Sequence, residues 1–198
     1  MQDVIISVAT LIMTLLVAGI VYTFAKRGSI RLTLRQKNVW LVLHIFFVII
    51  YFGGLLGSLL LAWTTHFTSD RSLIAAAHTF IPYCDHFMII PGAFGCLITG
   101  IWLSVRTQWG LTKHYWVIAK WVGNMAIIVF GGSLMRIWIS RTLQTSLDPA
   151  VPPLQNPAYL EYRLWLTSGL VFSLGVLLFL VVISYFKPWG KREKRRQA

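Results

Sequence analysis

The sequence predicts an all-α, polytopic membrane helical bundle with five transmembrane helices. Hydrophobic residues make up 57% of the 198-residue chain and charged residues 12%, whereas an ordinary soluble domain carries about 25% charged residues. The apolar residues form five stretches, each long enough to cross a hydrocarbon core of about 30 Å. Lys and Arg residues stand in blocks between these stretches. We therefore expect a single transmembrane domain over residues 1–198, embedded in the lipid bilayer.

Four of the five stretches have the length and composition of simple transmembrane helices. The predicted spans cover about residues 4–24, 39–63, 115–139 and 164–186. No positive residue precedes the first span, and Lys26 and Arg27 follow it at once. This pattern is typical of a retained helix rather than of a cleaved signal peptide.

The third span is harder to delimit, because the apolar sequence from Ser72 to Val105 is too long for one perpendicular crossing. Pro82 and Pro91 also interrupt it, and proline is unfavourable inside a helix. We expect the crossing to begin near Asp85 and to cover about residues 85–105, with residues 72–81 forming a short helix at the outer surface. A crossing that begins near Ser72 is the alternative.

The orientation follows from the basic residues, most of which fall on one side of a five-span chain. They are Lys26, Arg27, Arg31, Arg35, Lys37, Arg106, Lys113, Lys187, Lys191, Arg192, Lys194, Arg195 and Arg196. The positive-inside rule places the N-terminus outside and residues 187–198 inside as a basic cytoplasmic tail, in what we expect to be a bacterial cytoplasmic membrane. The tail is either a topology anchor or a binder of anionic lipid headgroups. Because the charges stand in blocks rather than across a fold, we expect no nucleic-acid partner.

A small set of polar residues lies inside the apolar spans, where a charged group costs at least a few kcal/mol and usually faces the bundle. His44 lies five residues into the second span and Lys120 five residues into the fourth. Both are therefore about 7–8 Å inside the cytoplasmic edge. Asn124 is one helical turn deeper on the face of Lys120. These residues are candidates for a ligand site between helices, although a structural hydrogen bond for His44 and snorkelling for Lys120 remain open.

A second polar group is expected toward the outer side. Asp85 would lie near the entry of the third span and Arg136 near the exit of the fourth, so we expect a structural ion pair between them. His86 adjoins Asp85. A metal site made of His66, His78, Asp85 and His86 is a weaker alternative, because their spacing is not that of a tight ligand set.

Three motifs resemble a family of small bacterial integral membrane proteins of uncharacterised activity. They are LHIFFVIIYFGG (43–54), DHFMIIPGAFGCLITGIWL (85–103) and WVIAKW (116–121). The family is distantly similar to copper-resistance D-like membrane proteins and to HemJ-type protoporphyrinogen oxidases, which use a membrane His and a Lys in a haem b site. By position, the resemblance implies these roles for His44 and Lys120. The first helix is an addition to the four-helix pattern, and the Arg and second His of the HemJ motif are missing.

Two classes of function follow, with a purely structural role as a third. The first is a haem-b-binding protein for electron transfer or porphyrin or quinone chemistry, with His44 as an axial iron ligand and Lys120 and Asn124 beside it. His86 could be a second axial ligand only if the third span begins near Ser72. The second is a transport or accessory subunit with a membrane-protein partner or a second copy. The sequence does not decide whether the chain is an enzyme, and it contains no hydrolytic nucleophile–base set.

Overall fold

The computed structural model describes residues 2–28 and 31–191, and over these residues the chain is helical without a β-strand. Five of its helices are long and apolar enough to cross a membrane. Their elements are α1 (Gln2–Arg27), α2 (Leu34–Thr64), α3 (Arg71–Cys84) with η1 (Asp85–Ile89) and α4 (Ile90–Arg106), α5 (Tyr115–Phe130) with η2 (Gly131–Met135) and α6 (Arg136–Ser146), and α7 (Pro157–Phe186). A short 3-10 turn, η3 (Pro153–Gln155), precedes α7. The predicted five-helix membrane bundle is confirmed.

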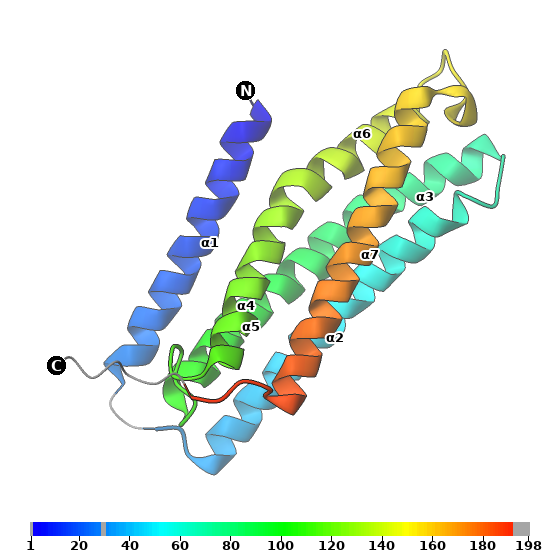
Figure 1. The fold of residues 1–198 in the computed structure, drawn as a ribbon. Coiled ribbons are helices and arrows are strands. Elements are labelled where there is room, and N and C mark those ends of the chain that lie inside the picture. The colour runs from blue at the N-terminus through cyan, green and yellow to red at the C-terminus, as the bar shows by residue number, and fades with distance from the viewer. Residues whose placement is uncertain (1, 29–30, 192–198) are drawn as a thin grey trace.

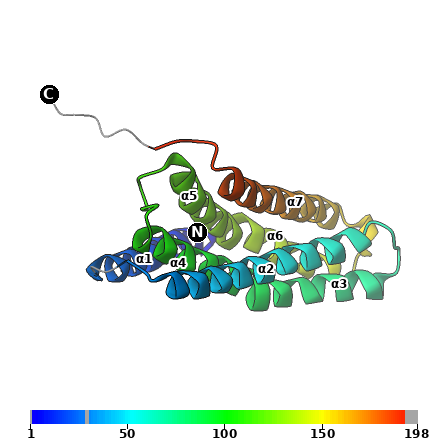
Figure 2. The same ribbon diagram turned by 90° about the horizontal axis from the view of Figure 1, so that it is seen from below.

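Four of the long helices form a bundle, and α1 packs on its side (Figure 1). The bundle consists of α2, the continuous helix α3–η1–α4, the continuous helix α5–η2–α6, and α7. Along one half, α2 and α7 pack with α4 and α5, and along the other half they pack with α3 and α6. Helix α1 lies against α4, α5 and η2, so in Figure 2 it forms one edge of the molecule.

The loops sort onto two ends of the bundle. The α1–α2 and α4–α5 connections and the end of α7 lie at one end, and the start of α1 and the α2–α3 and α6–α7 connections lie at the other (Figure 1). The first end holds the blocks of basic residues, and following the positive-inside rule we call it the inner end. In the tail, Lys187 lies 4.7 Å from the centre of the Trp109 ring. Lys191 is also described, whereas the basic residues of the predicted tail in 192–198 lie outside the described residues.

The predicted break in the third span is wrong. The segment from Arg71 to Arg106 is a single helix, and the part predicted to lie on the surface is its outer half, α3. The helix continues through Pro82 and widens into a π-helical turn at Asp85–Ile89, where the Asp85 N–H donates to the carbonyls of Ile81 and Pro82. This turn lies directly before Pro91, whose ring would clash with the Phe87 carbonyl in a regular α-helix. Such π turns are a recognised way to absorb a disturbed hydrogen-bond ladder.

Small residues bring α2 and the third helix into close contact. A Cβ atom added at Gly92 would lie 2.7 Å from backbone atoms of Tyr51, and one added at Gly54 would lie 2.8 Å from the Cβ of Met88. Close approach of backbones through glycine is a main source of helix association in lipid, where hydrophobic burial contributes little. The small residues of the two helices therefore form their contact.

Candidate functional site

The inner half of the bundle contains a polar site to which each of the four bundle helices contributes. The residues are His44 from α2, Thr99 from α4, Lys120 and Asn124 from α5, and Ser184 from α7. His44 continues the inward stripe of α2 that contains the buried residues Tyr51 and Leu55. Lys120 precedes the buried Asn124 by one helical turn on α5. The periodicity of both helices thus turns these polar groups toward the bundle.

The half-buried imidazole of His44 is held in one orientation by Thr99. The Nδ1 atom of His44 lies 2.7 Å from the Thr99 hydroxyl oxygen, and that hydroxyl donates to the Gly95 carbonyl at 2.6 Å. Because the single Thr99 hydroxyl proton is used on Gly95, the Nδ1–H of His44 must be the donor to Thr99. The neutral imidazole then carries its lone pair on Nε2, for which the described part of the chain provides no hydrogen-bond partner.

Lys120 of α5 is fixed from α7. Its Nζ donates to the Ser184 hydroxyl at 2.8 Å and lies 6.0 Å from the centre of the Trp116 ring. By residue count Lys120 and His44 are at the same depth, each about 7–8 Å inside the edge of its span. The site therefore combines an imidazole with a free nitrogen and a cation at one depth.

Asn124 has a structural hydrogen bond in the same region. Its Nδ2 donates to the Ala93 carbonyl at 3.3 Å, and only 8% of the residue is exposed. This bond joins α5 to α4 one turn deeper than Lys120. Its amide oxygen is the group that remains for a ligand.

His86 lies far from His44 along the bundle. It precedes Thr99, the hydrogen-bond partner of His44, by 13 residues on one helix, which corresponds to about 20 Å. Its Nδ1 lies 2.7 Å from the Pro82 carbonyl, and its side chain is exposed. The structure brings His44, Lys120 and Asn124 to one region and does not bring His86 to it.

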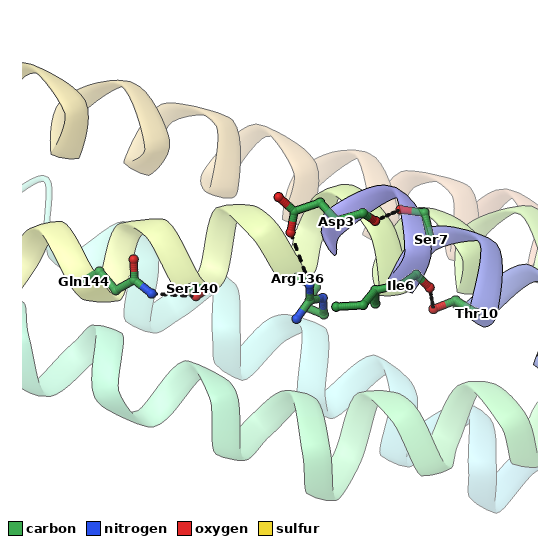
Figure 3. A network of polar contacts seen from close by, with 7 residues as sticks. All are labelled: Asp3, Ile6, Ser7, Thr10, Arg136, Ser140 and Gln144. Carbon is green, nitrogen blue, oxygen red and sulfur yellow. Dashed lines mark hydrogen bonds and ion pairs between the residues drawn. The ribbon is translucent and has the colours of Figure 1, made fainter. Parts of the chain in front are cut away.

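The expected Asp85–Arg136 ion pair is not formed. Arg136 instead donates to Asp3 of α1 at 3.3 Å (Figure 3). The reason is the packing of the two π turns, since η2, which Arg136 follows, packs on α1, whereas η1, which contains Asp85, packs on α2. Arg136 therefore ties the start of α1 to the outer half of the bundle.

Comparison with known proteins identifies the chain at the level of its family. A family profile described as a predicted integral membrane protein, DUF2269, matches residues 38–188. The chain belongs to this family. No curated protein and no solved structure matches it, and these comparisons give no support to the similarity with copper-resistance D-like or HemJ-type proteins.

The DUF2269 match coincides with the four-helix bundle. It begins four residues into α2 and ends just after α7, so it includes the whole inner polar site and leaves out α1. The matched region is therefore the bundle, and α1 lies outside the match.

A second polar cluster at the outer end of the DUF2269 bundle was missed by sequence reasoning. His78, which we expected in a short helix at the outer surface, is 1% exposed, and its Nε2 lies 3.1 Å from the hydroxyl of the fully buried Tyr159. Arg163 donates to the Thr65 carbonyl at 2.9 Å and lies over the Tyr159 ring. The spacing in the sequence could have indicated this burial, because Ile74, His78 and Ile81 share one helical face.

The outer histidines do not form a metal site. His78 is bonded to Tyr159 and His86 to Pro82, while His66 is exposed in the turn after α2. Partial burial, with the nearby charge of Arg163 as a second cause, lowers the pKa of His66 below its ordinary value. Across residues 2–28 and 31–191, no three His, Cys, Asp or Glu side chains are grouped so that they could hold a metal ion.

Proposed function

We propose that this DUF2269 protein binds haem b at the inner polar site and serves a redox step in the membrane. The observation that carries the proposal is the orientation of His44, whose Nδ1–H is engaged by Thr99 so that the Nε2 lone pair is left free. An imidazole held in this way through its other nitrogen is the usual arrangement of a metal-ligating histidine. When bound, haem b supplies a one-electron iron couple.

The residues of the site fit the chemical groups of haem b. His44 Nε2 is a suitable axial ligand, and Gly100 lets α4 approach the imidazole closely, because a Cβ there would lie 3.4 Å from His44 Cε1. Lys120 provides a point charge for a propionate, and it would exchange its hydrogen bond to Ser184 for that carboxylate. The resemblance to proteins with a membrane His and Lys in a haem site points in the same direction.

We assign the axial role to His44 alone. The helix spacing of about 20 Å between His86 and the partner of His44 excludes both from one iron within this bundle. Protoporphyrinogen oxidation is not part of the proposal, since LLLAWTTH (59–66) stands where the HemJ motif has its Arg and second His.

The proposed location is the cytoplasmic membrane of a bacterium, with the tail at the anionic inner leaflet. Lys187 and Lys191 stand at the inner end of the bundle, and each basic residue near such a surface contributes about 1 kcal/mol of binding. The protein reconstituted in nanodiscs with and without anionic lipid tests this part, with the rate of tryptic cleavage in the tail as the readout. Cleavage should be slower with anionic lipid, and equal rates in both lipids would reject it.

An accessory subunit is the second candidate, and α1 favours it. This helix lies outside the region that the family profile matches. Many of its apolar side chains are exposed, for example Val4 (66%) and Phe24 (60%). A membrane partner or a second copy could pack there. Co-purification of a stoichiometric partner that is lost on deletion of residues 1–27 would support this candidate.

Haem titration tests the main proposal. The purified, haem-free protein in nanodiscs should bind one equivalent of haem b, with a shifted Soret band, and His44→Ala should lose this binding while His66→Ala retains it. His66 is a fair control because it is the exposed histidine at the opposite end. Unchanged binding by His44→Ala would exclude the site.

A further inference from the structure

The outward face of the third helix carries a polar group where the bilayer offers it no partner. His86 is exposed and lies 15 residues from the outer end of the helix and 20 residues from the inner end. These spacings correspond to about 22 and 30 Å, so the imidazole is close to the middle of the membrane. Lipid chains cannot hydrogen-bond, and polar groups at this depth are expected to have a specific partner.

The tautomer of the neutral His86 imidazole is determined by its contact with Pro82. Its Nδ1 lies 2.7 Å from the Pro82 carbonyl, which can only accept, so Nδ1 carries the proton. In the neutral imidazole Nε2 is then an acceptor, and no described residue donates to it. The exposed face therefore presents a hydrogen-bond acceptor.

Aromatic rings flank this acceptor on the same outward face. Phe80, Tyr83 and Phe87 are 58, 57 and 73% exposed. The rings of Tyr83 and Phe87 are parallel to within 4°, with centroids 6.4 Å apart. Flat rings of a ligand stack well on such a surface. A matching ligand would be apolar enough to dissolve in the bilayer, would have a flat ring, and would carry a hydroxyl that donates a hydrogen bond.

We propose that this face binds a lipid-soluble hydroquinone, with its ring on Tyr83 and Phe87 and one hydroxyl donating to His86 Nε2. The ligand reaches the site from the bilayer, which explains why an exposed intramembrane face can be a binding site without a cavity. Binding does not depend on haem b. A hydroquinone would also give the redox step a membrane-soluble partner, and this link rests on the proposed function.

The test measures binding of a radiolabelled decylbenzoquinol to haem-free protein in nanodiscs under anaerobic conditions, with empty nanodiscs as background. Saturable binding is expected, and His86→Ala should weaken it at least tenfold. The dimethyl ether of the same compound cannot donate a hydrogen bond, so the wild type should bind it at least tenfold more weakly than the quinol. The wild type and His86→Ala should bind this ether equally. Phe179→Ala is the matched control, because Phe179 is an exposed aromatic residue on α7 without a neighbouring histidine.

A second variant tests the aromatic rings without disturbing the π turn. Tyr83→Leu/Phe87→Leu retains the apolar face and the His86–Pro82 bond but removes the rings, and it should also weaken binding. The proposal is overturned if both variants bind like the wild type, or if binding does not exceed that of empty nanodiscs. It also fails if native mass spectrometry shows a dimer that His86→Ala dissociates, because a second copy would then cover this face. His44→Ala should bind the quinol normally, so loss of the haem site and loss of the quinol site are distinguishable.

Discussion

The Nε2 atom of His78 lies 3.1 Å from the hydroxyl of Tyr159, and neither residue is more than 1% exposed. This contact joins α3 to α7 at the outer end of the bundle, where Arg163 also reaches across to Thr65. Hydrogen bonds between membrane helices contribute modestly, about 0.6 kcal/mol on average. A buried polar group left without a partner costs more, about 1–3 kcal/mol.

Tyr159→Phe should therefore destabilise the bundle. The substitution removes only the hydroxyl and leaves the Nε2 of His78 buried without a partner, so we expect a loss of roughly 1–2 kcal/mol of unfolding free energy. Reversible unfolding in bicelles measures it. Tyr185→Phe is the control, because Tyr185 is 81% exposed and its loss of a hydroxyl should have no effect. Equal stability of the two variants would show that the His78–Tyr159 bond contributes nothing.

The sequence predicted the helices better than it predicted their side-chain partners. Hydropathy locates five spans because a membrane requires long apolar helices, and the depths of His44 and Lys120 follow from counting residues along them. The outer half of the third helix was misjudged because Pro82 is normally a helix breaker. The helix continues through Pro82, and the π turn that follows it, with His86 donating to the Pro82 carbonyl, depends on local geometry that composition does not reveal.

Partners across helices require the packing itself. Asp85 and Arg136 looked complementary because each stood near the same predicted edge, yet Arg136 faces α1 and pairs with Asp3. Thr99 shows the same limit. Its position on α4 is visible in the sequence, but the bond to His44 depends on the close contact between α2 and the third helix that Gly92 and Gly54 allow.

The start of α3 should respond to acid through Asp70. Its carboxylate accepts from the Ser72 N–H at 2.8 Å and from the Ser72 hydroxyl at 2.7 Å, and these bonds lower the pKa of Asp70 below its ordinary value. Because the folded pKa is the lower one, the stabilisation is complete above the unfolded value of about 3.9 and is lost as the pH falls through the folded pKa.

Amide hydrogen exchange of residues 71–75 measures this effect. Protection of these amides should decrease as the pH is lowered through the acidic range, after correction for the intrinsic exchange rate. Asp70→Asn should keep the cap and remove this pH dependence, because Asn is also a good N-cap residue and does not titrate. A wild type with constant protection would show that the carboxylate charge does not support the cap.

Thr99→Val should weaken haem binding without removing the ligand. The substitution keeps the shape of the side chain and removes the acceptor of the His44 Nδ1–H, so the imidazole loses its fixed orientation. Loss of such a supporting contact typically lowers metal affinity by 10–100-fold. Haem titration measures it, with Thr142→Val as control, because Thr142 is equally buried but lies in α6 near the outer end. Equal affinity of the two variants would mean that Thr99 does not orient the ligand.

Lys120→Met should weaken haem binding, because it removes the positive charge that is proposed to pair with a propionate. The comparison that isolates this charge uses haem dimethyl ester, whose propionates are neutral. The wild type should bind haem b more tightly than Lys120→Met does, by roughly tenfold or about 1.4 kcal/mol, and the two proteins should bind the ester equally. If the ester is affected as strongly as haem b, Lys120 acts through packing rather than through its charge.

The most direct test of the account is a reduced-minus-oxidised absorption spectrum of the protein purified from cells with an adequate haem supply. The wild type should show a Soret band and the visible bands of a b-type haem. His86→Ala should retain them, and His44→Ala should lose them while still inserting in the membrane. A featureless wild-type spectrum, or a full haem spectrum from His44→Ala, would contradict the central claim that His44 is the haem ligand.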